Sequence, residues 1–221
     1  MDPAKEAADV SALAALAEPT RKRLYEHVVR QAGPVSREEA ASALGLALRT
    51  AAFHLDRLAE ASLLDVVYER RSGRTGPGAG RPAKLYRRPD REITVSVPPR
   101  RYELAAELLA RAVQDSAATG EPVRAVLHRE AHELGTEMGG EGGADLTALL
   151  ELCGFEPRYE DGDVVLLNCP FRRLARRHPE TICGMNLHLL RGVLTGMGDL
   201  AHTAVLAPAQ GRCCVRLEAA D

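Results

Sequence analysis

The first thirty residues carry apolar side chains at the spacing of amphipathic helices. Val10, Leu13 and Leu16 line one apolar stripe, and residues 20–28 form a second stripe that ends before Gly33. Spacings of three and four residues place these side chains on one face of a helix, where they can pack on a core. The pattern therefore predicts two helices at the start of the chain.

The next stretch has the pattern of two short helices joined by a tight turn. Ser36-Arg37-Glu38-Glu39 has the S-x-x-E form of a capping box and starts a helix that stops at Gly45. A further helix follows, with Ala51, Leu55 and Leu58 at i, i+4 and i+7 as its buried face. Two short helices with a glycine in the connecting turn predict a helix-turn-helix.

After these helices the pattern changes to the alternation of strands. Residues 66–70 alternate, residues 84–87 supply a return strand, and the Gly- and Pro-rich segment 71–82 between them predicts a loop. Residues 66–88 contain seven basic side chains against Glu69 alone, although the whole chain has 29 basic and 31 acidic residues. This local charge predicts a wing that faces phosphates; the alternative is a solvated flexible loop.

The second half of the chain predicts more helices and a few strands. Residues 101–116 form a long amphipathic pattern, residues 123–138 form another, and the glycine-rich segment 139–143 is expected to act as a hinge. Beyond it the expected order is a helix at 146–153, a hairpin around 161–163 leading into a strand at 164–167, a helix through Leu190, and a final strand at 214–217.

These elements predict an α+β fold in three parts. Residues 1–95 form a winged helix-turn-helix DNA-binding domain, residues 96–140 a helical dimerisation and linker region, and residues 141–221 a cysteine-containing sensor domain that binds a metal or a cluster. A hydrophobic share of 45% with 27% charged residues is typical of a folded domain. The start lacks a signal peptide and no apolar run reaches about 18 residues, so we expect a cytoplasmic protein without a membrane partner.

The second helix of the predicted motif is expected to read base edges in the major groove of double-stranded DNA. Arg49 is placed to contact guanine, Thr50 and Arg57 to contact phosphates, and Phe53 to meet a thymine methyl group. For His54 a packed position in the core and a backbone contact remain open. The full set of expected DNA contacts is Arg49, Thr50, Phe53, His54, Arg57, Arg71, Arg74, Arg81 and Lys84.

A single winged domain makes few contacts with DNA, so specific binding is expected to need two copies. We therefore predict a homodimer on an inverted-repeat operator, joined mainly through residues 101–116.

Five cysteines are an odd number in a chain expected to stay reduced, which favours metal or redox chemistry over disulfides. Cys169, Cys183 and Cys213 lie too far apart in sequence for a C-x-x-C motif, but three separate elements can still bring them to one pocket. Because neighbouring side chains on a strand alternate, we prefer Cys213 as the ligand and place Cys214 in the core. His178 is either a fourth ligand or a helix end. The alternative is that all are core cysteines.

Several of these segments resemble a known family. The chain resembles the winged helix-turn-helix of ArsR-like bacterial transcription regulators at residues 44–46, 49–58 and 80–86. The chain also resembles the Suf repressor group at residues 168–171, 178–179, 183–187 and 211–214. Members of this group are iron-sulfur-binding regulators of cluster-assembly operons. The resemblance implies a repressor whose affinity for its operator is controlled by an iron-sulfur cluster, a [4Fe–4S] cluster held by Cys169, Cys183 and Cys213.

Two residues depart from the family pattern. Ala47 occupies the position where relatives commonly carry a Ser or Thr helix cap, which weakens the start of the helix by roughly 1 kcal/mol if nothing replaces the cap. Ser62 stands where a glycine is usual before the wing. Neither departure changes the fold that the resemblance implies.

Two other functions use the same cysteines. One is a zinc-sensing or thiol-redox-sensing regulator, because zinc also prefers thiolate ligands. The other is an enzyme, a thiol oxidoreductase built on Cys213 and Cys214. The sequence contains no C-x-x-C, G-x-S-x-G, P-loop or H-E-x-x-H motif, so we expect no enzymatic activity.

Overall fold

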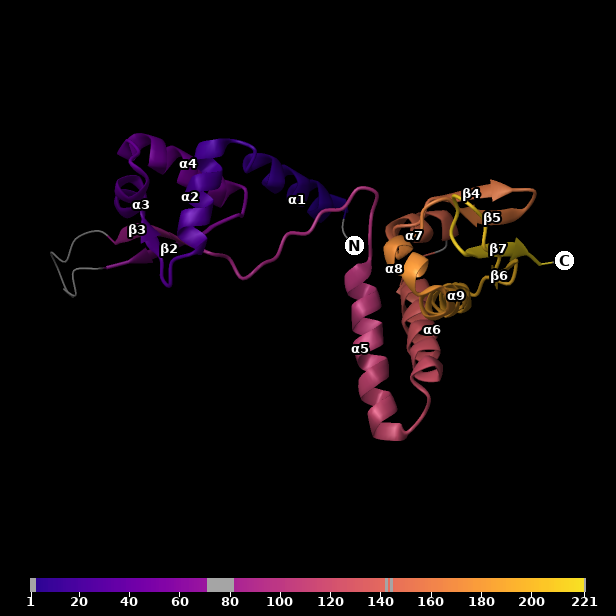
Figure 1. Ribbon diagram of the computed structural model, residues 1–221. Coiled ribbons are helices and arrows are strands. Elements are labelled where there is room, and N and C mark those ends of the chain that lie inside the picture. The colour runs from indigo at the N-terminus through magenta and orange to yellow at the C-terminus, as the bar shows by residue number, and fades with distance from the viewer. Residues whose placement is uncertain (1–2, 71–81, 142, 144, 221) are drawn as a thin grey trace. The chain divides into compact units, whose positions relative to one another are not determined.

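The computed structural model describes residues 3–70, 82–141, 143 and 145–220, which fall into two compact units (Figure 1). The N-terminal unit is Met1–Val95 and the C-terminal unit is Ser96–Asp221. Each unit has a hydrophobic core built from side chains of its own part of the sequence, and each combines helices with an antiparallel sheet.

The N-terminal unit packs its helices on a small three-stranded sheet. Strand β3 lies in the middle and pairs with β1 and with β2, so that Val66 lies opposite Tyr86. The predicted hairpin and both helices of the predicted helix-turn-helix are present. The elements are α1 (Pro3–Ala15), α2 (Pro19–Val29), β1 (Val35–Ser36), α3 (Arg37–Leu44), α4 (Leu48–Glu60), β2 (Asp65–Glu69) and β3 (Ala83–Arg87).

Local sequence signals fix the ends of α3 and α4. The Ser36 side chain accepts from the Glu39 N–H and the Glu39 carboxylate accepts from the Ser36 N–H, which completes the predicted capping box. Gly45 ends α3 with φ of 64°. Ala47 gives α4 no side-chain cap, as predicted. Ser62 adopts φ of 55°, in the left-handed region that favours glycine, which explains why a glycine suits this position.

The apolar stripe predicted at the start of the chain is wrong for Val10 and Leu13, whereas Leu16 packs against the core. Val10 and Leu13 are 49% and 41% exposed, whereas Ala12 is buried. Asp9 is also buried, and its carboxylate accepts a hydrogen bond of 2.9 Å from Arg91. The ion pair with a distant arginine allows α1 to turn a charged residue inward, and this leaves two of its larger apolar side chains on the surface.

The C-terminal unit is built around α9 (Pro179–Met197), which is buried on most of its sides. One side of α9 packs on α6 and another packs on the four-stranded sheet, whose order is β4-β5-β7-β6. Helix α5 packs on α6 (Figure 1). The remaining elements are α5 (Tyr102–Thr119), α6 (Val123–Glu141), α7 (Leu146–Leu152), β4 (Pro157–Glu160), β5 (Asp163–Leu166), α8 (Arg172–Arg177), β6 (His202–Leu206) and β7 (Val215–Ala219).

The hinge predicted at residues 139–143 is wrong for its first part. Gly139 and Gly140 belong to α6, which continues to Glu141, and Gly139 is buried against α9. Over the described part of the chain, no helix has both the length and the apolar character needed to cross a membrane.

Glycines allow α6 and α9 to touch backbone to backbone. A methyl group placed on any of four glycines would lie between 2.0 and 2.3 Å from a carbonyl oxygen of the other helix, far inside van der Waals contact. In each helix the two glycines are four residues apart and therefore share one face. The four are Gly135 and Gly139 on α6, and Gly192 and Gly196 on α9.

We expect Gly139→Ala to destabilise the C-terminal unit by roughly 3 kcal/mol, because overpacking against backbone cannot be relieved by turning a side chain. Its methyl group would meet the Val193 carbonyl oxygen at 2.3 Å. Urea unfolding followed by circular dichroism measures the change.

Gly140→Ala is the matched control. It lies one residue further along the same helix and has no atom within 4 Å of its added methyl group. We expect it to be neutral or to stabilise by up to about 1 kcal/mol. Equal stability of the two variants would contradict the close contact of α6 with α9.

Candidate nucleic-acid interface and cysteine cluster

Helix α4 presents a polar and aromatic face to solvent while its opposite face is buried in the core. Arg49, Thr50, Phe53 and Arg57 are all exposed, and Phe53 is 56% exposed. The Arg57 guanidinium lies 5.7 Å from the centre of the Phe53 ring, within the range of a cation–π contact. The side chains that the sequence assigned to base and phosphate contacts therefore lie on one accessible helix face.

His54 faces the protein more than the solvent. Its side chain is 15% exposed, and its Nδ1 lies 3.4 Å from Glu18 Oε2 at the start of α2. The hydrogen bond from the Thr20 N–H, helped by that from the Arg21 N–H, holds the pKa of Glu18 below its usual value. The His54 side chain thus extends from α4 toward the Glu18 carboxylate, which caps α2.

Lys84, which the sequence predicts to contact DNA, forms an ion pair within the protein. Its Nζ lies 2.5 Å from Asp56 Oδ1, and the Tyr86 hydroxyl donates to the same oxygen at 2.6 Å. Because Asp56 lies on α4 and the other two on β3, these bonds tie the helix to the wing strand. Burial raises the pKa of Asp56, but the hydrogen bonds from Lys84 and Tyr86 outweigh it and hold that pKa below its usual value.

The wing residues Arg71, Arg74 and Arg81 lie outside the described residues. The strands that lead into and out of this segment, β2 and β3, are paired over their whole length.

We expect Asp56→Ala to cost about 1–3 kcal/mol of stability in the N-terminal unit, because it leaves the buried Tyr86 hydroxyl without its acceptor. Since the folded-state pKa of Asp56 is lowered, its contribution is complete at neutral pH and is lost as the pH falls through that value. Unfolding measured between neutral and strongly acidic pH should therefore show wild type and variant converging in acid.

Glu60→Gln is the control, since Glu60 pairs with Arg57 on the exposed side of the same helix. An exposed pair contributes little, and we expect a change within about 0.5 kcal/mol. A loss in Glu60→Gln as large as in Asp56→Ala would refute a specific role for the link between helix and wing.

In the C-terminal unit, four cysteines from three places in the sequence lie together. Cys169 follows β5, Cys183 lies in the first half of α9, and Cys213 and Cys214 immediately precede β7. Side-chain hydrogen bonds join Cys169 to Cys213, Cys213 to Cys214, and Cys214 to Cys183. We call these four residues the cysteine cluster.

The expectation that Cys213 and Cys214 alternate on a strand is wrong. Strand β7 begins only at Val215, so both residues lie in the preceding turn and both can interact with other thiols. Cys213 is buried, whereas Cys214 is only partly buried rather than part of the core interior. Cys153 is buried in the hydrophobic core.

N–H groups are directed at the sulfurs of the cysteine cluster. The Asn186 amide donates to Cys213 Sγ at 3.3 Å, and the Phe171 and Val215 N–H groups bond Cys169 and Cys213. Asn186 is fully buried, and its Oδ1 has no hydrogen-bond partner. The sequence analysis gave Asn186 no role, although it is a polar residue within an apolar helix.

The loop that carries Cys169 is held by Arg100, which the sequence analysis also missed. The Arg100 guanidinium donates to Asn168 Oδ1 at 2.6 Å and to the Cys169 carbonyl oxygen at 3.0 Å. Asn168 in turn donates to the Gly154 carbonyl oxygen at 2.7 Å. These bonds fix the loop from two sides and set the position of the Cys169 thiol.

The thiols of the cysteine cluster differ in acidity. The Cys214 thiol donates to Cys183 and, against burial, holds the pKa of Cys183 below its usual value. The same bond, with burial, raises the pKa of Cys214 to about 12. Cys169 lowers the pKa of Cys213, but Cys214 and burial outweigh it and raise that pKa to about 12. The bond with Cys213, with burial, raises the pKa of Cys169. Cys183 therefore loses its proton first.

Among the side chains that the structure describes, no three histidine, cysteine or acidic residues are arranged as ligands of one metal ion. His178 is exposed between α8 and α9, whereas Cys169 and Cys213 are buried.

We expect iodoacetamide at about pH 8 to alkylate Cys183 before any other cysteine, because the thiolate is the reactive form. Mass spectrometry of peptides from timed samples measures the order. Cys214 is the internal control, since it is also partly exposed but its pKa is raised. Labelling of Cys214 at the same rate as Cys183 would contradict the assigned order of acidity.

Comparison with known proteins bears on the N-terminal unit. A family model described as a helix-turn-helix domain matches residues 16–67, a range that includes α2, α3 and α4. No curated protein and no solved structure matches the chain. The chain thus contains a helix-turn-helix domain, and this domain indicates a DNA-binding transcriptional regulator.

Proposed function

We propose that the chain is a repressor, active in the cytoplasm as a homodimer on an inverted-repeat operator, whose DNA affinity depends on an iron-sulfur cluster. Cys169, Cys183 and Cys213 would hold a [4Fe–4S] cluster, with Cys214 beside them as a further thiol. The sensing function is supported by one observation: four thiols from distant parts of the sequence lie close together.

The surroundings of the thiols support an anionic group at this place. Three N–H donors are directed at Cys169 and Cys213, and such donors favour negatively charged sulfur. When bound, an iron-sulfur cluster supplies an oxidisable centre whose gain or loss changes the state of its cysteine ligands.

Arg100 offers a physical route from the cysteine cluster toward the DNA-binding unit. It lies five residues after the boundary between the units, and its own N–H donates to Ser96 Oγ at 2.8 Å. Its side chain bonds the Cys169 carbonyl oxygen. A change at Cys169 therefore alters the bonds that hold the first residues of the C-terminal unit. DNA affinity and ligand state are then coupled in both directions.

Helix α5 supports the proposed homodimer. Its inner side, which includes Ala105 and Leu108, is buried against the unit's own core. Val113 nevertheless remains 56% exposed, whereas Leu109 is partly buried against the same core. We assign the contact with a second copy of the chain to the exposed side of α5 within residues 101–116, which includes Val113.

We expect the protein prepared without air to bind its DNA at least tenfold more tightly than the same protein after exposure to air. The probe is a duplex selected from a random library by the anaerobic protein, and affinity is measured at one fixed salt concentration. Iron and sulfide are determined on the same samples. Equal affinity in the two states would contradict the proposed sensing function without contradicting the proposed DNA binding.

Two comparisons make this test specific. Arg49→Ala should weaken binding by roughly 5- to 150-fold, the effect of losing one good base contact. Arg124→Ala, which removes an exposed arginine of α6 that pairs with Glu180, should leave affinity unchanged. A colourless anaerobic protein with stoichiometric zinc and no sulfide would replace the iron-sulfur proposal by the zinc-sensing alternative.

A further inference from the structure

Helix α8 gives the C-terminal unit a small basic surface that the proposed function does not use. The other two residues of this helix, Leu174 and Ala175, pack against the hydrophobic core of the unit. Arg172 is partly buried, and the remaining arginines of the helix are exposed. We refer to the following four residues as the α8 arginines: Arg172, Arg173, Arg176 and Arg177.

The α8 arginines lack acidic partners. Within the part of the chain that the structure describes, none of the four forms an ion pair with a carboxylate. The acidic residue closest in sequence is Glu180, and its carboxylate pairs with Arg124 of α6 at 3.1 Å. Because a guanidinium is always charged in a protein, α8 carries four positive charges that no described side chain offsets.

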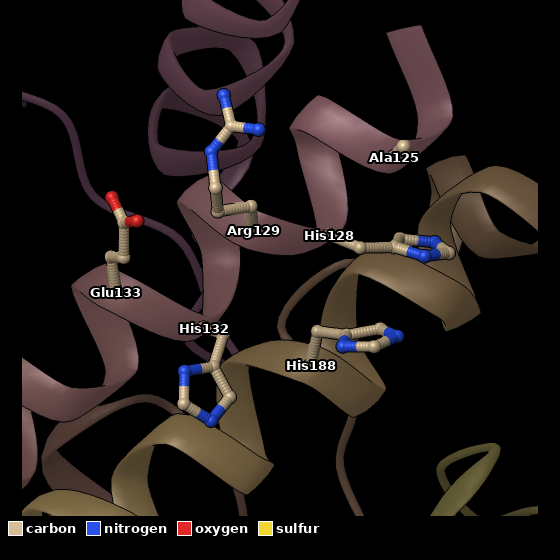
Figure 2. A pocket seen from close by; sticks show the side chains of 6 residues that line it. All are labelled: Ala125, His128, Arg129, His132, Glu133 and His188. Carbon is tan, nitrogen blue, oxygen red and sulfur yellow. The ribbon is translucent and has the colours of Figure 1, made fainter. Parts of the chain in front are cut away.

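Exposed arginines elsewhere in the C-terminal unit do pair with carboxylates. Arg129 lines a pocket on α6 and α9 together with the stacked rings of His128 and His188 (Figure 2). Its guanidinium donates to Glu121 at 2.7 Å. Arg158 donates to a glutamate of its own strand, β4, at 3.0 Å. Among the described residues, the lack of acidic partners therefore distinguishes α8 from these other basic positions.

The spacing of the α8 arginines does not favour the helix itself. Arg172 and Arg176 are four residues apart, as are Arg173 and Arg177, so the members of each pair are neighbours on the helix surface. Like charges at this spacing repel each other and destabilise a helix. A local arrangement that opposes folding indicates a binding function for these side chains.

Helix α8 lies beside the residues with which the C-terminal unit begins. The Arg101 N–H donates to the Pro170 carbonyl oxygen at 3.2 Å, and the Arg100 guanidinium donates to the Cys169 carbonyl oxygen at 3.0 Å. Both acceptors lie within three residues of the start of α8. The connection from β3 to this point, residues 88–101, spans at most about 50 Å when fully extended. This length limits how far α8 can lie from DNA that the N-terminal unit holds.

We propose that the α8 arginines bind the phosphate backbone of the DNA duplex that the helix-turn-helix domain recognises. The six residues of α8 span about 9 Å, a length over which one DNA strand carries about two to three phosphates. Guanidinium groups match phosphate in both charge and hydrogen-bond geometry. The contacts add affinity that does not depend on base sequence. This inference rests on the DNA-binding part of the proposed function and does not require an iron-sulfur cluster.

The test is the salt dependence of DNA binding by Arg173→Gln/Arg176→Gln/Arg177→Gln, which removes the three exposed charges of α8. Affinity is measured between about 50 and 200 mM monovalent salt, for the duplex selected from the random library and for an unrelated duplex of equal length. Each lost phosphate contact lowers the slope of log affinity against log salt by about 0.9, so we expect a decrease of about 2.7 for each bound chain. Across this salt range, wild-type affinity should fall about 40-fold more than that of the variant.

Both duplexes should show the same decrease in slope, because phosphates are read without regard to sequence. An unchanged slope would overturn the proposal and would leave an acidic protein as the partner of α8. Absence of DNA binding by the wild-type protein would overturn both this inference and the proposed function. Equal affinity before and after exposure to air would contradict only the sensing function.

Arg124→Gln/Arg129→Gln/Arg158→Gln is the matched control. It removes the same net charge from the same unit, at arginines that pair with carboxylates. We expect the salt slope of this control to stay close to that of the wild type. An equal decrease in both triple variants would show that net charge alone sets the slope, and the specific role of α8 would then be wrong.

Stability gives a second, independent measurement. Removal of the repelling charges should leave the urea unfolding of the α8 variant unchanged or shift it to slightly higher urea. A clear loss of stability would assign the α8 arginines to the fold and would also overturn the proposal.

Discussion

The backbone contact between α6 and α9 is the constraint on which the C-terminal unit depends. Glycines at 135, 139, 192 and 196 remove the side chains that would otherwise hold the two helices apart. Dispersion forces are strongest at such close approach, and the small residues let the two backbones come into contact. Helix α9 is thereby fixed between α6 and the sheet, and this position brings Cys183 and Asn186 to the turn that carries Cys213 and Cys214.

The N-terminal unit depends on a polar contact instead. Asp56 receives hydrogen bonds from Lys84 and Tyr86, so that α4 and the wing strand β3 keep a fixed relation. A protein that reads DNA with a helix and a wing needs both at a defined spacing, because the grooves and phosphates of the duplex are themselves at fixed positions. Lys84 thus contributes by positioning the helix, and the exposed side chains of α4 remain available for DNA.

The sequence allowed the local features of the N-terminal unit to be predicted. The capping box at Ser36, the turn at Gly45 and the buried face of α4 depend on residues within a few positions of one another. The orientation of α1 could not be predicted, because Asp9 is buried by pairing with Arg91, far along the chain. The role of Asp56 was hidden for the same reason, since a carboxylate on the polar side of a helix is usually solvated.

In the C-terminal unit the spacing of the cysteines and the family resemblance led to Cys169, Cys183 and Cys213. The position of Cys214 depended on where β7 begins, and element boundaries are poorly determined by pattern alone. Gly139 was misread as part of a hinge, because a glycine that gives flexibility and a glycine that allows close packing look alike until the partner helix is known. Arg100 and Asn186 act through contacts that no local pattern records.

Helix α9 carries Cys183 toward the thiols and His188 toward the imidazoles, and these two residues are separated by about 7.5 Å along the helix axis. A regular helix is stiff over so short a length, so a displacement of one of the two residues along the helix axis also displaces the other. A shift of α9 along its axis would therefore change two contacts together, the bond between Cys183 and Cys214 and the stacking of His188 on His128.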